Sequence, residues 1–138
     1  MNYLVDTCVF SEFKKLRPER RVIDWFDSHP DDSLFLSVLT IGEIEKGIIR
    51  MPESKRKADL ALFLETLVDR FDRRTLNVDT ATAHRWGQLI GELESKGRVL
   101  PVIDSLLAAT ALQHDLTVVT RNEDDFAAAG VRVLNLWD

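Results

Sequence analysis

The chain has 138 residues, 45% of them hydrophobic and 30% charged, which favours one globular domain over residues 1–138. The net charge is -5, so composition gives no general basic surface for nucleic acid, and the single cysteine, Cys8, excludes an internal disulfide framework. No apolar run approaches the roughly 18 residues of a membrane span, and the first residues lack a signal-peptide pattern. We therefore expect a soluble, cytoplasmic protein with no membrane partner.

The first part of the chain alternates between strand and helix patterns. The run Tyr3–Val5 predicts a short buried strand, and Thr7 can cap a helix that continues through Phe10, Phe13 and Leu16 and ends before Pro18. The spacing of apolar residues then predicts a helix at 20–28, a strand at 33–37, and helices at 38–50 and 53–71.

The second part continues the alternation. It predicts a strand at 76–78, a helix at 80–95, a loop at 96–99, a helix at 103–114, a strand at 116–119, a short helix at 123–129 and a strand at 131–135. Strands that alternate with helices imply a mostly parallel sheet of four to five strands with helices on both faces. The predicted fold class is therefore α/β, a three-layer α/β/α domain.

Four acidic residues fall near points where predicted strands and helices meet: Asp6, Glu43, Asp104 and Asp125. The carboxyl ends of parallel strands share one edge of a sheet, where ligands usually bind, so these carboxylates can meet in one pocket. Carboxylates that gather in this way repel one another unless they are protonated or hold a cation, and oxygen ligands favour Mg²⁺ or Mn²⁺. This pattern points to metal-assisted phosphoryl chemistry.

Each acid also has a simpler interpretation. Asp6 can cap the helix that follows it, and Asp104 can cap the apolar helix in which it stands. Glu43 borders the apolar face of its helix and, taken alone, reads as a surface residue. Spacing does not decide which of Glu123, Asp124 and Asp125 points into the crevice.

Together, four segments make the chain resemble the PIN-domain ribonucleases, and most closely the VapC toxins of type II VapBC toxin–antitoxin systems. The segments are Leu4-Val5-Asp6-Thr7, Leu39-Thr40-Ile41-Gly42-Glu43-Ile44 with Gly47-Ile48, Asp104-Ser105-Leu106-Leu107-Ala108-Ala109-Thr110-Ala111, and Val118-Val119-Thr120-Arg121-Asn122 followed by Asp125-Phe126. The resemblance covers Tyr3 to Leu136 and implies a PIN fold.

The resemblance also implies which residues carry the chemistry. Asp6, Glu43 and Asp104 match the three main acids of the family, and Asp125 matches a more variable fourth, for which Asn122 or Asp124 can substitute. These residues would be catalytic and would hold Mg²⁺ or Mn²⁺. Cys8 stands where the family usually has Asn or another polar residue, so we expect a hydrogen bond beside Asp6 to be missing.

The implied function is a metal-dependent endoribonuclease that cuts RNA with a metal-activated water and leaves a 5′-phosphate and a 3′-hydroxyl. The implied partners are the RNA substrate, a second copy of the chain in a homodimer, and a cognate VapB-type antitoxin in a higher assembly. The antitoxin would lie in an apolar groove that shields the acids, and Phe10, Phe13 and Leu16 are candidates for part of that groove.

Two other functions remain open from the residues alone. One is a Mg²⁺-dependent phosphatase with Asp6 as a covalent nucleophile. Such enzymes usually have a second acid two residues further on, and Cys8 at that position counts against this function. The other is a non-catalytic PIN-like module that binds RNA or a partner. Basic residues crowd the segment from Lys14 to Arg21, which is either a solvated face or a rim that steers RNA.

Overall fold

The strand β1 (Tyr3–Val5) lies at the centre of an all-parallel sheet in the computed structural model, which describes residues 1–138. The other strands are β2 (Leu34–Ser37), β3 (Thr75–Leu76), β4 (Thr117–Val119) and β5 (Val133–Leu134). The strand order is β3-β2-β1-β4-β5, with Leu4 opposite Phe35 on β2 and Val118 on β4. The predicted sheet is confirmed, and every strand pair in it is parallel.

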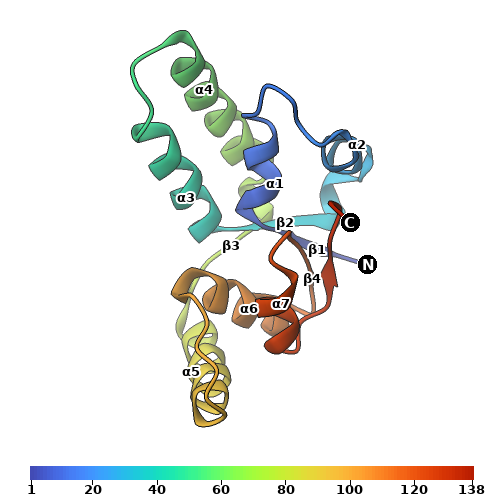
Figure 1. Cartoon of the computed structure of the whole chain (residues 1–138), viewed down its shortest axis with the longest axis vertical. Coiled ribbons are helices and arrows are strands. Elements are labelled where there is room, and N and C mark those ends of the chain that lie inside the picture. Colours follow the sequence, from blue (N-terminus) through green and yellow to red (C-terminus); the bar gives the residue numbers. More distant parts are fainter.

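Seven α-helices cover the two faces of the sheet (Figure 1). They are α1 (Thr7–Glu12), α2 (Arg20–Ser28), α3 (Val38–Ile49), α4 (Lys55–Arg70), α5 (Thr80–Ser95), α6 (Val102–His114) and α7 (Glu123–Ala128). In Figure 1, α1 to α4 lie above the sheet and α5 to α7 lie below it. The three-layer α/β/α architecture predicted from the alternation of elements is thus confirmed.

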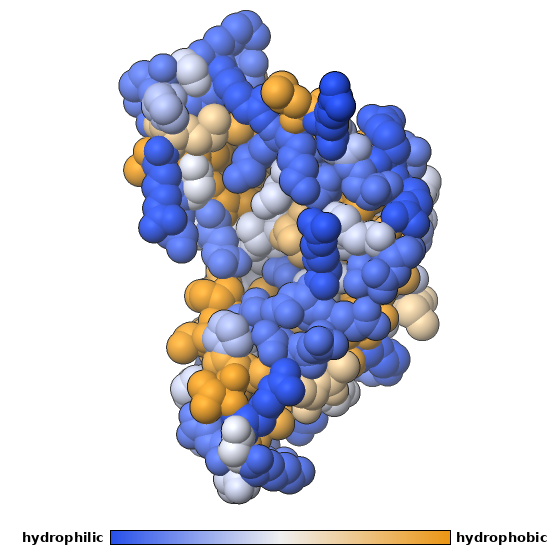
Figure 2. Space-filling model, in the orientation of Figure 1, coloured by the Kyte–Doolittle hydropathy of each residue, from blue (hydrophilic) through white to orange (hydrophobic).

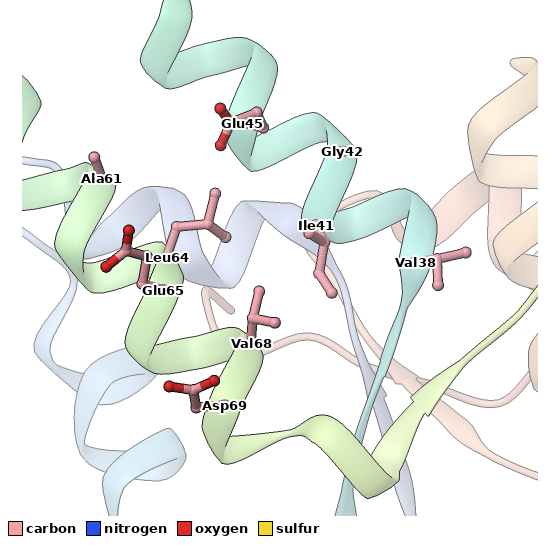
Figure 3. Close-up of a pocket in the computed structure, with 9 residues that line it drawn as sticks. All are labelled: Val38, Ile41, Gly42, Glu45, Ala61, Leu64, Glu65, Val68 and Asp69. Carbon is pink, nitrogen blue, oxygen red and sulfur yellow. The ribbon is translucent and has the colours of Figure 1, made fainter.

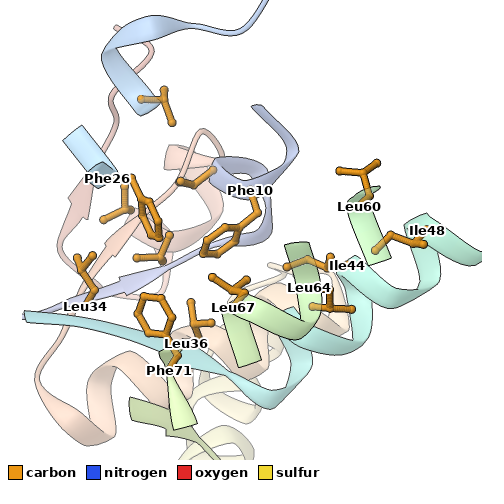
Figure 4. Packing of buried hydrophobic residues seen from close by; sticks show 14 residues of the cluster. Phe10, Phe26, Leu34, Leu36, Ile44, Ile48, Leu60, Leu64, Leu67 and Phe71 are labelled. Carbon is orange, nitrogen blue, oxygen red and sulfur yellow. The ribbon is translucent and has the colours of Figure 1, made fainter. Parts of the chain in front are cut away.

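The two layers of helices have separate cores, because successive side chains of a strand point to opposite faces of the sheet. Val5 and Val119 belong to the core under α1 to α4, which Figure 4 shows packed around Phe10 and Phe26. Their neighbours Leu4 and Val118 belong to the second core, with α6 and α7. Both central strands are therefore buried on both faces, and only their ends are open to ligands.

The first helix is shorter than the sequence predicts. α1 ends at Glu12, and its N-terminal cap is Asp6 rather than Thr7. Phe10 is only 2% exposed and belongs to the core, whereas Leu16 lies beyond the helix and is 90% exposed. These three predicted residues therefore do not line one common groove on α1, because Phe13 also packs inward, against Phe26 and Phe63.

Other element boundaries differ by a few residues. β3 begins at Thr75 and ends at Leu76, earlier than the predicted strand, and β5 covers only Val133–Leu134. The predicted loop around Gly97 is confirmed, and Gly97 has a φ of +80°, a left-handed conformation that a side chain would strain. None of the helices combines the length and the apolar character that a membrane crossing requires.

Candidate active site

Asp6 occupies the junction between β1 and α1, at the carboxyl edge of the sheet. Its side chain is almost entirely buried, with 7% exposure. The Thr7 amide donates to Oδ1 at 2.7 Å, and the buried Thr120 hydroxyl, just after β4, donates to Oδ2 at 2.7 Å. Burial raises the pKa of Asp6 despite these hydrogen bonds, and the charge of Glu43 raises it further. Asp6 therefore caps α1 and is also poised beside other acids.

Glu43 joins Asp6 through Thr7. Glu43 lies on the second turn of α3 and is half-buried, and the Thr7 hydroxyl donates to its Oε1 at 2.7 Å. α3 begins directly after β2, and the Ser37 hydroxyl caps it by accepting from the Leu39 amide at 3.0 Å. The interpretation of Glu43 as an isolated surface residue is therefore wrong, because its carboxylate faces the junction of β1 and α1.

Asp104 lies in the first turn of α6, and Asn122 connects it to Asp125. The Asn122 side-chain amide donates to Oδ2 of Asp104 at 2.7 Å and to Oδ2 of Asp125 at 3.0 Å. Burial, followed by the charge of Asp6, raises the pKa of Asp104 to about 6, and the charges of Asp125 and Glu43 add to this effect. The four acids from four distant segments therefore share one electrostatic environment.

Three neighbouring residues, Asn122, Asp124 and Asp125, are candidates for the fourth member of the acid cluster. Asp125 is half-buried and faces Asn122, and its Oδ1 accepts from the Arg98 guanidinium at 2.9 Å. Asp124 is exposed on the same helix. The structure thus places Asp125 and Asn122 with the other acids and leaves Asp124 outside. Arg98 comes from the loop before α6, where no sequence pattern indicated a role.

Cys8 provides a polar contact where we expected one to be missing. Its thiol lies 3.8 Å from Oδ2 of Asp6 and 3.7 Å from the Thr120 hydroxyl, and it accepts from the Arg121 amide at 3.3 Å. Burial, together with the nearby Asp6 charge, raises the pKa of Cys8 to about 11. The thiol is therefore a neutral link between β1 and the loop after β4.

The donor set fits a divalent cation that keeps part of its water shell. No three acidic, histidine or cysteine side chains converge closely enough here to enclose an ion by themselves. The pKa values of Asp6 and Asp104 are nevertheless raised, so their negative charge lacks a matching positive charge. Mg²⁺ usually retains several waters and binds few carboxylates directly, which suits this looser arrangement of oxygen ligands.

Several polar residues that the sequence left without a catalytic role are structural. The Trp86 indole donates to the Ser105 hydroxyl at 2.8 Å, and that hydroxyl donates to the Val102 carbonyl at 2.6 Å. His29 stacks on Trp25, with ring centroids 4.0 Å apart. These contacts give Ser105 and His29 structural roles, and the acids are the principal chemical feature of the site.

A groove of about 730 Å³ lies between α3 and α4. Figure 3 shows apolar side chains between the two helices, with acidic side chains along them. The apolar residues include Ile41, Leu64 and Val68, and the acidic ones are Glu45, Glu65 and Asp69. The groove begins at Val38, the first residue of α3, and so lies on the helix that carries Glu43.

The fold and the acid cluster define a class of protein that the comparisons identify. The sequence matches the family model described as PIN domain over residues 3–131, and the chain belongs to this family. It is 32% identical to the VapC ribonuclease Y4jK of Sinorhizobium fredii, over 98% of this chain and 97% of the relative. It is 36% identical to the toxin FitB of Neisseria gonorrhoeae, over 97% of each.

Solved structures agree with this assignment. The crystal structure of FitAcB from Neisseria gonorrhoeae aligns with a TM-score of 0.92 at 35% identity and covers 98% of each chain. VapBC-5 from Mycobacterium tuberculosis, described as a member of the VapBC family of toxin–antitoxin systems, aligns with a TM-score of 0.70 at 26% identity. That alignment covers 97% of this chain and 98% of the other.

Proposed function

We propose that the chain is a metal-dependent endoribonuclease and the toxin of a toxin–antitoxin pair, with residues 1–138 forming one PIN domain. The observation that carries the proposal is the meeting of Asp6, Glu43, Asp104 and Asp125 at one edge of the sheet, with the pKa of Asp6 and Asp104 raised. The relatives named as VapC ribonuclease and as toxin support the same activity and role.

The four acids are the proposed ligands of Mg²⁺ or Mn²⁺, with Asp125 the least important of them. A bound ion of this kind lowers the pKa of a coordinated water and offsets charge on the leaving oxygen of a phosphodiester. Thr120 and the Thr7 amide fix both oxygens of Asp6 in direction. Asn122 similarly holds Asp104 and Asp125 at a set separation. These residues prepare the ligand geometry before substrate binds, which limits reorganisation during the reaction.

The first test is cleavage of total RNA and of transfer RNA by purified, antitoxin-free protein in Mg²⁺, Mn²⁺ or EDTA. We expect discrete cuts that require metal and leave 5′-phosphate and 3′-hydroxyl ends. Ends with a 2′,3′-cyclic phosphate would contradict a water nucleophile. Cleavage that persists unchanged in both Asp6→Asn and Asp104→Asn would show that these acids are not the site.

The same preparations separate the two alternative functions. A phosphatase would accumulate an acid-stable covalent phosphate on Asp6 and turn over small phosphate esters. Both oxygens of Asp6 accept short hydrogen bonds, which suits a fixed ligand better than a free nucleophile. A non-catalytic module would bind RNA but leave it intact in every metal, although such a module gains nothing from retaining four mutually repelling acids.

The proposed antitoxin site is the groove between α3 and α4. Its apolar floor and its three acidic side chains are complementary to a segment that carries apolar and basic side chains. Ala61→Lys places a positive charge in this groove at an exposed position, and we expect weaker binding of the co-expressed antitoxin because the proposed segment is basic. Leu62→Lys, at an exposed position outside the groove, is the matched control. Equal binding by both variants would place the antitoxin elsewhere.

We also propose that the chain forms a homodimer. Exposed apolar side chains remain near α5 and α6, where Figure 2 shows hydrophobic residues gathered at the lower left. Val78, Val99 and Val102 are among them, with 37%, 76% and 63% exposure. Apolar surface of this kind favours association. Light scattering on Val102→Glu should show a shift toward monomer, and an unchanged mass would exclude this surface.

A further inference from the structure

The basic residues from the turn after α1 to the start of α2 differ in whether they already form ion pairs. Lys15 contacts Glu12 at 2.6 Å, Arg20 contacts Asp24 at 3.2 Å and Arg21 contacts Glu19 at 3.0 Å. These pairs engage three of the five basic residues in the run and leave Lys14 and Arg17 outside any ion pair. Because the protein carries a net charge of -5, an RNA chain that approaches the acid cluster depends on unpaired cations close to it.

Arg121 is an unpaired cation whose backbone is built into the acid cluster. It stands between Thr120, which donates to Asp6 at 2.7 Å, and Asn122, which donates to Asp104 at 2.7 Å. Its own amide donates to the Cys8 thiol at 3.3 Å. The Arg121 side chain is exposed and forms no ion pair, unlike Arg98, which already binds an acid of the cluster. The backbone of Arg121 is thus fixed beside the acids, while its side-chain charge is available to bind an anion.

The guanidinium of Arg121 rests over the ring of Trp137, with Cζ 5.8 Å from the ring centroid. The Trp137 indole donates to Oε2 of Glu12 at 3.1 Å, and Glu12 is only 2% exposed. The Trp137 carbonyl accepts from the Arg21 guanidinium at 2.9 Å. These two hydrogen bonds hold the Trp137 ring and its backbone in place, so the ring offers the Arg121 guanidinium a fixed platform beside the last residue of α1.

We propose that Arg121 binds an RNA phosphate adjacent to the scissile one, with Trp137 as the platform that positions it. Arginine suits this role because its planar guanidinium can bind a phosphate through two hydrogen bonds while it stacks on an aromatic ring. The six residues of α1 separate the acids at its start from Glu12 at its end by roughly 9 Å. The contact therefore falls on a neighbouring phosphate, outside the acid cluster. This inference rests on the proposed function.

The test is the salt dependence of RNA binding in a protein that cannot cut. Asp104→Asn protein is titrated with a labelled single-stranded oligouridylate and with total transfer RNA at several salt concentrations. Adding Arg121→Gln should weaken binding at low salt and reduce the slope of log K against log salt by about 0.7 for the single strand, the effect of losing one phosphate contact. Arg85→Gln, an exposed arginine on α5 outside any ion pair, should leave both quantities unchanged.

Two further variants separate charge from position. Arg121→Lys keeps the charge and should restore the slope. In the cleaving protein, Arg121→Gln and Trp137→Leu should raise KM and leave kcat within about twofold, because neither residue contacts the reacting atoms. For Arg121→Gln, a merely structural role would instead lower the melting temperature and the fraction of active protein.

The outcomes distinguish the two proposals. If wild-type protein cuts RNA and Arg121→Gln binds it with the same slope and affinity as its parent, the assignment of Arg121 is wrong while the proposed function stands. If Arg121→Gln and Arg85→Gln weaken binding equally, the effect is general charge and the assignment is also wrong. Absence of metal-dependent cutting by wild-type protein would instead reject the proposed function.

Discussion

Two buried carboxylates mark the opposite ends of α1, and their surroundings differ. Glu12, 2% exposed, accepts from the Glu19 amide at 2.8 Å, from Lys15 at 2.6 Å and from the Trp137 indole at 3.1 Å. Burial alone would raise the pKa of Glu12, but these donors together outweigh it and lower the pKa. Asp6, at 7% exposure, has no cation among its partners, and burial raises its pKa.

The difference separates a carboxylate that stabilises the fold from one that is available for chemistry. A buried acid with enough donors, one of them cationic, is electrostatically satisfied and contributes to stability. Asp6 and its neighbour Asp104 instead face other acids, so the folded protein carries unbalanced negative charge at that point. A raised pKa from burial and like charges is a common property of functional sites. The exposed fraction alone does not distinguish Asp6 from Glu12, because both side chains are buried.

The largest expected difference between the acid cluster and Glu12 is in the rate of RNA cleavage. We expect Asp6→Asn and Asp104→Asn each to lower the rate of metal-dependent cleavage by at least about 100-fold, because each removes a charge from the proposed metal site. Glu12→Gln should keep the rate within a few fold at a temperature where it is folded. Initial rates on the same RNA measure all three. Loss of cleavage in Glu12→Gln equal to that in Asp6→Asn would remove the distinction.

A smaller loss is expected at the fourth acid. Asp125 already shares its charge with Arg98 at 2.9 Å, so replacing it removes less unbalanced charge than replacing Asp104. Asp125→Asn should therefore lower the cleavage rate by about 10-fold, the scale of a residue that orients the metal ligands. Asp124→Asn, exposed and one residue away, is the matched control and should behave as wild type. A greater loss for Asp124→Asn than for Asp125→Asn would reverse the assignment.

The sequence could predict the acids better than the residues that hold them. Asp6 follows an apolar strand, so its place at the sheet edge is encoded locally. Glu43 depends on how α3 packs against α1, and its helix alone gives it a surface position. The choice of Asp125 over Asp124 depends on the rotation of α7, because adjacent helical residues point about 100° apart. Arg98 reaches Asp125 only through tertiary packing, which no local pattern records.

The sequence also misplaced the end of the first helix. Apolar residues recur beyond Glu12 at helical spacing, and this periodicity predicted a helix as far as Leu16. The structure turns the chain at Phe13. Glu12 then accepts from the Glu19 amide, seven residues along, and from Trp137 near the other end of the chain. These contacts are formed by the folded chain and compete with helix continuation, which periodicity cannot reveal.

Neutralising Glu12 and neutralising Asp104 should change the stability of the fold in opposite directions. Glu12→Gln removes the charge that three donors surround, and we expect it to lower the free energy of unfolding by about 1–3 kcal/mol. Asp104→Asn relieves like-charge repulsion, and we expect a gain of about 1 kcal/mol in metal-free buffer at pH 7.5, reduced for its partial exposure to solvent. Urea denaturation in EDTA measures both. A loss of stability in Asp104→Asn would instead favour a structural capping role.

The smallest expected effect is the pH dependence of the stability changes that Asp104→Asn and Glu12→Gln cause relative to wild type. The pKa of Asp104 is about 6 when folded and near 3.8 when unfolded, so its ionisation destabilises the fold above pH 6 and this penalty disappears as the pH falls from 6 toward 4. The pKa of Glu12 is lowered by folding, so its contribution is complete above its ordinary value of 4.5 and is lost only in stronger acid. Between pH 7.5 and pH 5 in EDTA, the advantage of Asp104→Asn over wild type should therefore shrink while the deficit of Glu12→Gln stays constant. Parallel changes in both differences would mean that Glu12 and the acid cluster around Asp104 are not electrostatically distinct.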